Sequence, residues 1–259
     1  MRLGVLDVGS NTVHLLVVDA HRGAHPTPMH DDRWAVRLAE HVGPDDLLSR
    51  AGEKALLESV EEACRQAEKQ GCDDFMALAT SAIREARNGQ DVLDRIRRST
   101  GVELQVLTGE DEARLTFLAV RRWFGWSAGR LLVLDIGGGS LELAVGMDEL
   151  PDVALSLPLG AGRMTRRYLP DALEGGRPDL AALDALDEHA TALLEPAVAK
   201  LKKAGAPDLV AQALVDDADD DVRHAAQSAS RDRGEVWDRE GEAAAGADQA
   251  VPGGVMWRP

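Results

Sequence analysis

Apolar residues follow two kinds of pattern along the chain, short unbroken runs and sets spaced three or four positions apart. Short runs at 2–8 and 13–18 flank a Gly-Ser-Asn turn, which predicts two strands joined as a hairpin. Between 51 and 70 the apolar residues are spaced for one face of a helix, with charged residues between them. The same criteria predict a third strand at 34–38, further strands at 75–79 and 102–107, and helices at 91–98 and 110–124.

The opening pattern returns in the second half of the chain. The apolar run at 131–136 ends in a Gly-Gly-Gly-Ser turn, and a second strand follows at 141–146. Further along, the pattern predicts a strand at 153–159 and a short helix that follows residues 160–162 and ends at Tyr168. A long helix is predicted over 180–204, which Pro196 kinks or divides. Two halves that both open with a strand, an Asp-x-Gly turn and a returning strand predict an internal duplication, with the active site between the halves.

The composition changes near the end of the chain. From Asp216 onward there is no Leu, Ile or Phe, and Asp, Ala and Arg predominate. Such a segment buries too little apolar surface to offset the entropy of ordering it, so we expect an acidic, largely disordered tail at 216–259. The predicted organisation is therefore a first domain at 1–124, a second domain at 125–215 and this tail.

The charge of the chain bears on its partners. Acidic residues outnumber basic ones by 45 to 29, giving a net charge of −16, which argues against a protein that coats DNA or RNA. A local arginine cluster can still bind an anionic substrate, because it acts within a Debye length of about 8–10 Å. The sequence has no signal-peptide pattern, no run of about 18 apolar residues and no metal or redox motif at Cys64 and Cys72. We therefore expect a cytoplasmic protein with no nucleic-acid or membrane partner.

The strongest chemical signal is a pair of turns, DVGSNT at 7–12 and DIGGGS at 135–140. Glycine allows positive φ and close approach of the backbone, and successive amides in such turns can bind phosphate oxygens. The aspartate at the end of each strand can hold Mg²⁺ directly or through water. One such turn is equally well explained by the conformational needs of a tight hairpin, whereas two of them, each opening a similar domain, favour a phosphate clamp.

Four segments together resemble the exopolyphosphatase / guanosine pentaphosphate phosphohydrolase family, namely DVGSNT, ATSAIREA at 79–86, GEDEARL at 109–115 and DIGGGSLEL at 135–143. The resemblance runs in order from residue 1 to about 170, and more loosely to about 207. It implies an α/β fold of two ribonuclease H-like domains around a cleft, as in the actin/Hsp70/sugar-kinase superfamily, with the second domain incomplete in this chain. It also implies Mg²⁺-dependent release of the terminal phosphate from polyphosphate or guanosine pentaphosphate, a role in the stringent response, and a homodimer.

The resemblance implies a role for each motif residue. Glu112 is the implied general base, which deprotonates water for attack on the terminal phosphorus, although its neighbour Asp111 could take this role. Arg84 is the implied grip on the phosphate chain, because a guanidinium can bind phosphate through two parallel hydrogen bonds. The implied Mg²⁺-associated acids are Asp7, Asp135 and Glu142, and the implied phosphate loops contain Gly9, Ser10, Asn11, Gly137, Gly138, Gly139 and Ser140.

Each of these residues also has a purely structural explanation. Glu112 could stabilise a helix N-terminus, Glu142 could face solvent from a strand, and Arg84 could lie on a helix surface. For His14, which lies among apolar residues, we favour a hydrogen-bonded core histidine, and for 160–162 we favour a simple turn over an anion site at a helix N-terminus. Arg163, Arg166 and Arg167 could extend a polyphosphate track or be ordinary helix-surface arginines. Arg33 and Arg37 lie where the resemblance implies a substrate-side loop.

The resemblance weakens after the long helix. A strand begins as expected at 206–210, but the family's Gly-Thr-Ser-Lys type of turn is absent, which fits either a truncated or frame-shifted gene product or a natural divergent tail. An incomplete second domain would have an exposed sheet edge and uncovered apolar faces.

Three functions remain in view. The leading one is a phosphohydrolase, followed by a catalytically weak polyphosphate- or (p)ppGpp-binding regulatory protein. The third is an ATP-dependent sugar or acetate kinase, which the Glu112 segment disfavours because a kinase must exclude water. The sequence leaves open the choice between polyphosphate and guanosine pentaphosphate, the preferred chain length, the number of metal ions and the oligomeric state.

Overall fold

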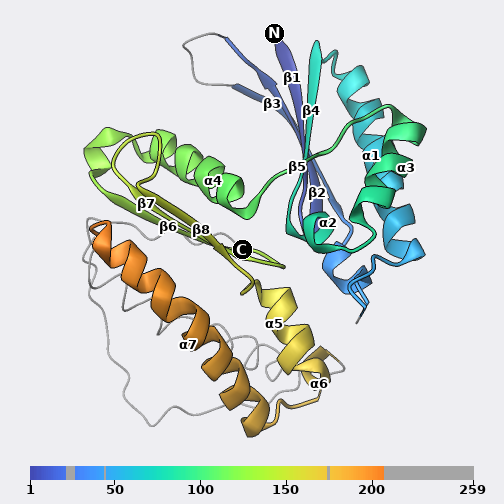
Figure 1. Ribbon diagram of the computed structural model, residues 1–259. Coiled ribbons are helices and arrows are strands. Elements are labelled where there is room, and N and C mark those ends of the chain that lie inside the picture. Colours follow the sequence, from blue (N-terminus) through green and yellow to red (C-terminus); the bar gives the residue numbers. More distant parts are fainter. Residues whose placement is uncertain (22–26, 44, 174–175, 207–259) are drawn as a thin grey trace, which may run out of the picture. The chain divides into compact units, whose positions relative to one another are not determined.

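The computed structural model describes residues 1–21, 27–43, 45–173 and 176–206, and the chain divides into two compact units (Figure 1). The first unit contains Met1–Glu112 together with two short returning segments, Ile136–Ser140 and Gly160–Arg163. The second contains Ala113–Asp135, Leu141–Leu159 and the described residues from Met164 onward. The predicted tail at 216–259 lies outside the described residues, and the predicted domain limits stay predictions.

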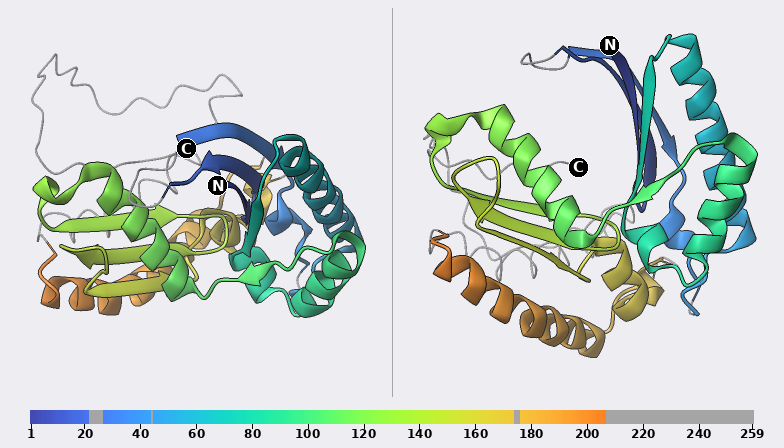
Figure 2. Two further views of the ribbon diagram at one scale, coloured as in Figure 1. Left: turned by 90° about the horizontal axis from the view of Figure 1, so that it is seen from above. Right: turned by 45° about the horizontal axis from the view of Figure 1, so that its top comes forward.

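A five-stranded sheet forms the centre of the first unit. Its strands are β1 (Arg2–Val8), β2 (Thr12–Asp19), β3 (Thr27–Ala35), β4 (Asp74–Ala79) and β5 (Gln105–Val106), in the order β3-β2-β1-β4-β5. β1 is antiparallel to β2 and parallel to β4. Helices α1 (Arg50–Lys69) and α3 (Gly89–Thr100) lie on the same face of this sheet, as both views in Figure 2 show. The short helices η1 (Leu38–His41) and α2 (Ser81–Glu85) follow β3 and β4.

Alternation along β1 and β2 decides which face of the sheet is covered. Successive strand residues point to opposite faces, so one face of this hairpin is apolar while the other carries Asp7 and His14. The apolar face packs against α1, whose own apolar residues recur at helical spacing. The fully buried residues of this core include Leu6, Val8, Val13, Leu15, Leu56, Val60 and Ala63. The Asp7 carboxylate therefore lies on the face of the sheet opposite α1.

The first unit differs from the sequence prediction in three elements. The third strand spans Thr27–Ala35 and not 34–38, because it is a polar strand at the edge of the sheet with no apolar alternation. The strand predicted at 102–107 is limited to Gln105–Val106. Helix α2 has no counterpart in the prediction, since five residues are too few to display a helical period.

The second unit contains a three-stranded sheet in the order β6-β7-β8. These strands are β6 (Leu131–Ile136), β7 (Leu141–Gly146) and β8 (Val153–Leu157). Helix α4 (Gly109–Phe124) lies on one side of the sheet and α7 (Leu180–Lys203) on the other (Figures 1 and 2). Phe117 of α4 packs in a cluster with strand residues Val133 and Ala144. Leu194 and Leu201 of α7 share a second cluster with alternate residues of β7.

Two expectations for the second unit are corrected. All six residues of β7 are buried, so the central strand has no uncovered apolar face, because α4 and α7 cover both of its sides. Helix α7 continues through Pro196 as one helix and is not divided there. β6 is an edge strand of the sheet that the described residues form, as an incomplete domain predicts. The remaining helices are η2 (Trp126–Ala128), α5 (Ala161–Tyr168) and α6 (Pro170–Leu173). Among the described residues, no helix has the length and apolar character to cross a membrane.

Candidate active site

The two glycine turns have the same hydrogen-bonded geometry. In the first turn, Gly9 N–H donates to the carbonyl of Thr12 at 3.0 Å, and in the second, Gly137 N–H donates to the carbonyl of Ser140 at 2.9 Å. A Cβ on Gly9 would lie 3.2 Å from the Thr12 oxygen, and a Cβ on Gly137 would lie 3.3 Å from the Ser140 oxygen. The internal duplication predicted from the sequence therefore extends to the backbone of these turns.

The carbonyl groups of the first turn are bound by the segment that follows β3. Ala39 N–H donates to the carbonyl of Ser10 at 2.9 Å, and Arg37 N–H donates to the carbonyl of Asn11 at 2.8 Å. Arg37 adopts the left-handed backbone region, with φ at 49°, which is uncommon for a residue with a side chain. We call residues 37–39 the first clasp.

The second turn is bound in the same way by the segment that follows β8. Ala161 N–H donates to the carbonyl of Gly137, and Arg163 N–H donates to that of Gly138, both at 2.9 Å. We call residues 160–163 the second clasp. Because the amides of Ala161 and Arg163 already bind these carbonyls, the structure favours the expected turn at 160–162 over an anion site at the helix N-terminus.

The opposite side of each turn carries amide N–H groups. In a trans peptide the C=O and the following N–H point in opposite directions. Because the carbonyls of the turns are bound by the clasps, the N–H groups of the residues that follow them point away from the clasps. These are the N–H groups of Asn11, Gly138 and Gly139. The N–H groups of Ser10, Asn11, Gly138 and Gly139 donate to no other residue in the described part of the chain. Such sets of backbone donors are suited to binding the oxygens of a phosphate group.

Glycine is required where the second turn meets the first. A Cβ on Gly138 would lie 2.9 Å from the Cβ of Ser10, and a Cβ on Gly139 would lie 2.7 Å from the Oγ of Ser81. The Ser10 and Ser81 hydroxyls are buried and hydrogen-bonded to each other at 2.8 Å. The two turns therefore lie side by side within the first unit, and Ser81 of α2 joins them. Ser81 is not among the site residues predicted from the sequence, although it belongs to the ATSAIREA segment that carries Arg84.

Arg84 and Glu112, predicted as phosphate grip and general base, form an ion pair. Arg84 Nη1 donates to Glu112 Oε2 at 2.9 Å and to the carbonyl of Leu107 at 3.0 Å. Their side chains are only 20% and 19% exposed, so Arg84 is not a simple helix-surface residue. Arg84 lies three positions after Ser81 in α2, so the ion pair lies within about one helical turn of the residue that joins the glycine turns.

Asp111 has the structural role that was considered for Glu112. Thr108 Oγ1 donates to Asp111 Oδ2 at 2.6 Å, while Asp111 N–H donates to Thr108 Oγ1 at 3.1 Å, which is a cap at the start of α4. The neighbouring carboxylate of Glu112 is directed instead at Arg84. This division of roles favours Glu112 over Asp111 as the base.

The three acids predicted to associate with Mg²⁺ differ in environment. Asp7 and Asp135 are exposed near the ends of β1 and β6, whereas Glu142 is 3% exposed and accepts a hydrogen bond from Ser156 Oγ at 2.8 Å. The solvent-facing alternative for Glu142 is therefore wrong. Among the described residues, no three His, Cys, Asp or Glu side chains gather into a metal-binding group. The carboxylate oxygens fit the ligand preference of Mg²⁺, and the metal site stays a prediction.

His14 is partly exposed and not a core residue, although its hydrogen bonding is satisfied. Its Nε2 lies 2.9 Å from Asp31 Oδ2 on β3. The hydrogen bond from His14 lowers the pKa of Asp31, and the nearby Arg33 guanidinium acts in the same direction.

The predicted arginine track is not supported by the contacts of its members. Arg33 pairs with Asp31, and Arg37 lies 3.6 Å from Glu40. Arg163 binds the carbonyl of Gly139 and pairs with Glu85, while Arg167 lies 5.4 Å from the centre of the Tyr168 ring. Arg166 also interacts with other groups. These contacts are with protein groups and do not define a path for a phosphate chain.

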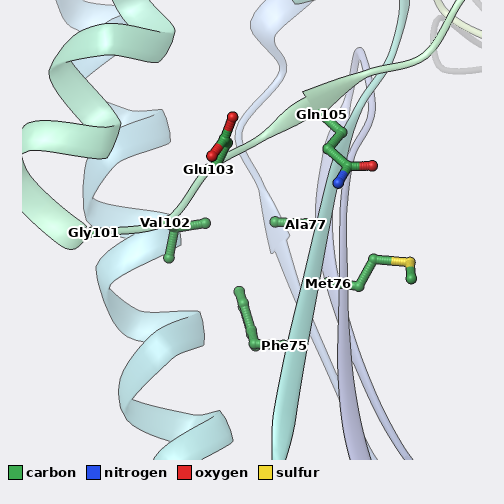
Figure 3. A pocket seen from close by; sticks show the side chains of 7 residues that line it. All are labelled: Phe75, Met76, Ala77, Gly101, Val102, Glu103 and Gln105. Atoms are coloured by element: carbon green, nitrogen blue, oxygen red, sulfur yellow. The ribbon is translucent and has the colours of Figure 1, made fainter.

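A surface pocket of about 310 Å³ lies elsewhere in the first unit, between β4 residues 75–77 and the segment 101–105 (Figure 3). Figure 3 shows Phe75, Ala77 and Val102 as its apolar lining, with the Glu103 side chain beside them. None of the predicted site residues lines this pocket.

The sequence matches the Ppx/GppA phosphatase family over residues 17–236. The chain belongs to this family. The matched range extends beyond residue 207, where the resemblance found in the sequence motifs became weak.

Relatives support the same assignment. The chain is 59% identical over 209 residues to exopolyphosphatase 1 of Mycobacterium tuberculosis strain H37Rv, and 56% identical over 209 residues to exopolyphosphatase 1 of Mycobacterium leprae. Each alignment covers 81% of this chain and 60% of the relative. The chain thus spans about 60% of the length of these Ppx/GppA relatives.

Solved structures agree with the fold. An exopolyphosphatase from Cytophaga hutchinsonii has a TM-score of 0.70 at 23% identity, with 78% of this chain and 64% of that chain covered. The Aquifex aeolicus PPX-GPPA enzyme has a TM-score of 0.61 at 25% identity, with 80% and 65% covered. The predicted fold class is confirmed, with two ribonuclease H-like domains of the actin/Hsp70/sugar-kinase superfamily. The second is incomplete in the described residues, with three strands against five in the first.

Proposed function

We propose that this chain is a phosphohydrolase that releases terminal phosphate from inorganic polyphosphate in an Mg²⁺-dependent reaction. The observation that carries the proposal is the Arg84–Glu112 pair next to two glycine turns with outward-directed amides. A cation, a carboxylate and a set of backbone donors are the parts that phosphoryl transfer to water needs.

The proposed mechanism assigns a role to each part. The amides of Asn11, Gly138 and Gly139 bind phosphate oxygens and neutralise the charge that develops on them in the transition state. Glu112 orients a water molecule and accepts its proton as the oxygen attacks the terminal phosphorus in line with the leaving phosphate. Arg84 holds the Glu112 carboxylate in place and can turn toward the phosphate chain when substrate binds.

We propose that Mg²⁺ associates, directly or through water, with the acids that the family resemblance implies, which are Asp7, Asp135 and Glu142. When bound, Mg²⁺ neutralises charge on the phosphate oxygens. Burial of Glu142 and its hydrogen bond from Ser156 keep this carboxylate in a fixed orientation.

Polyphosphate is the favoured substrate because the two mycobacterial relatives described above are named exopolyphosphatases. Guanosine pentaphosphate, which presents the same terminal phosphoanhydride, is the second substrate we propose to test. A homodimer, a cytoplasmic location and a role in the stringent response belong to the same proposal.

A second candidate function uses the same glycine turns for binding alone. The outward-directed amides need no general base to hold an anion, so the chain could bind polyphosphate or (p)ppGpp without efficient hydrolysis. In that case it would act as a regulatory protein whose glycine turns hold the anion.

One pair of measurements separates these functions. Phosphate release from polyphosphate and from guanosine pentaphosphate is followed with Mg²⁺ and with excess chelator, and binding of both anions is measured by calorimetry on the same preparation. Mg²⁺-dependent release supports the hydrolase. Binding without release from a chain that circular dichroism shows to be folded supports the regulatory protein, and a folded chain that neither binds nor hydrolyses contradicts both.

A further inference from the structure

Arg163 contacts the second glycine turn through both its main chain and its side chain. Its backbone N–H donates to the carbonyl of Gly138 at 2.9 Å, and its Nε donates to the carbonyl of Gly139 at 2.8 Å. Gly160 allows this close approach, since a Cβ there would lie 2.3 Å from the backbone of both Gly139 and Ser140. With Ala161 bound to Gly137, the second clasp binds every carbonyl of the three-glycine run.

These contacts fix the direction of the amides on the other side of the turn. The carbonyl of Gly139 and the N–H of Ser140 belong to one planar peptide, and so do the carbonyl of Gly138 and the N–H of Gly139. A donor that holds a carbonyl therefore also orients the following amide. Glycine otherwise has wide backbone freedom, so a run of three glycines needs such contacts to keep one conformation.

The far end of the Arg163 side chain reaches helix α2. Its Nη2 forms an ion pair with Glu85, the residue after Arg84. Both side chains are about one-third exposed. Arg163 thus links the second turn to helix α2, in which Arg84 binds Glu112.

We propose that Arg163 is a positioning residue, which holds the Gly139 and Ser140 amides and helix α2 in the arrangement that binds a phosphate group. It acts through the glycine turn and not as part of a track that contacts the phosphate chain. The first turn supports this assignment, because the first clasp binds its carbonyls at equivalent positions. The proposal rests on the proposed function, in which the ordered amides bind the phosphate group of the substrate.

The first test needs no ligand. ¹⁵N relaxation is measured on the full chain for the wild type, Arg163→Gln, Glu85→Gln and the control Arg167→Gln, which removes an exposed arginine from the same helix. Arg163→Gln removes the side-chain bond to the Gly139 carbonyl, whose peptide carries the Ser140 N–H. We expect the order parameter of the Ser140 amide to fall clearly in Arg163→Gln, to fall less in Glu85→Gln and to stay unchanged in the control. Rigid amides in both test variants would overturn the proposal.

The second test measures the dissociation constants of tripolyphosphate and of longer polyphosphates for the same proteins. We expect Arg163→Gln to weaken binding about tenfold or more, because misplaced binding groups lose that much. The loss should be the same for every chain length, since the same terminal site is affected. A loss that grows with chain length, or one matched by Arg167→Gln, would identify Arg163 as a phosphate-contacting residue and overturn the proposal.

The two tests also separate this proposal from the proposed function. If the wild type neither binds tripolyphosphate nor releases phosphate, the proposed function fails, while the relaxation measurement still decides whether Arg163 orders the turn. If Arg163→Gln does not fold, Glu85→Gln carries both tests, because it removes the ion pair and leaves the bond from Arg163 to Gly139 in place.

Discussion

Arg121 of α4 has an unusual environment for an arginine, because its side chain is fully buried in the second unit. Its guanidinium donates to three backbone carbonyls, those of Gly125 at 3.1 Å, Gly129 at 2.6 Å and Gly146 at 3.2 Å. It also lies 5.8 Å from the centre of the Phe117 ring, and its Nε has no partner among the described residues. Arg121 therefore fixes the loop after α4 to the end of β7.

We predict that Arg121→Met destabilises the second unit by about 3 kcal/mol. Hydrogen bonds from a charged group contribute about 1.5–3 kcal/mol each, and the three carbonyls would lose their donor. Part of this loss is offset, because the substitution also removes a buried charge whose desolvation is costly. Breaking one side of a buried charged interaction typically costs about 3–5 kcal/mol, so we take the lower end of that range.

The adjacent Arg122 provides a matched control. Arg122 pairs with Glu149 at 3.0 Å, but both side chains are about half exposed, so Arg122→Met should cost about 0–1 kcal/mol. Urea unfolding followed by tryptophan fluorescence reports on this region, since Trp123 and Trp126 are its neighbours in sequence. If Arg121→Met and Arg122→Met differ by less than about 0.5 kcal/mol, the buried guanidinium does not hold this loop and the reasoning is refuted.

Two further predictions concern the first unit. Gly160→Ala should lower the free energy of unfolding by about 1–3 kcal/mol, because its Cβ would lie 2.3 Å from rigid backbone. In the same urea titration Gly9→Ala should cost clearly less, because its Cβ would lie 3.2 Å from a single oxygen. Equal costs for the two variants would contradict this ranking. The lowered pKa of Asp31 contributes stability that is present above about pH 4 and lost as the pH falls through its folded value, so Asp31→Asn should flatten the acid side of the stability profile measured by thermal unfolding. An unchanged acid limb in Asp31→Asn would show that the bond from His14 adds no stability.

The sequence predicts the elements whose signal is local. The two hairpins are predicted because each combines apolar alternation with a glycine turn. The ends of α1 and α3 are predicted to within a few residues, since apolar spacing and the left-handed Gly101 mark them. β3 is misplaced because a polar edge strand is held by pairing with its neighbour and has no apolar pattern of its own.

The contacts that shape the site join segments far apart in the chain, so no local sequence pattern predicts them. Ser81 and Gly139 are in contact although they are 58 positions apart in the sequence, and only the folded chain brings Arg163 to Glu85. The burial of Arg121 is equally hard to predict from the sequence, because an arginine in a helix is usually expected on the surface. The motif resemblance predicts which residues belong to the site, while the tertiary structure determines their partners.

The role of Glu112 as general base is tested most directly by the initial rate of phosphate release from polyphosphate with Mg²⁺ for three proteins. These are the wild type, Glu112→Gln and Asp111→Asn, with folding verified by circular dichroism. We expect a loss of about 10²–10⁴-fold in Glu112→Gln. We expect a loss of less than about tenfold in Asp111→Asn, which weakens the cap of α4. A rate for Glu112→Gln close to that of the wild type, or an equal loss in Asp111→Asn, would show that Glu112 is not the base.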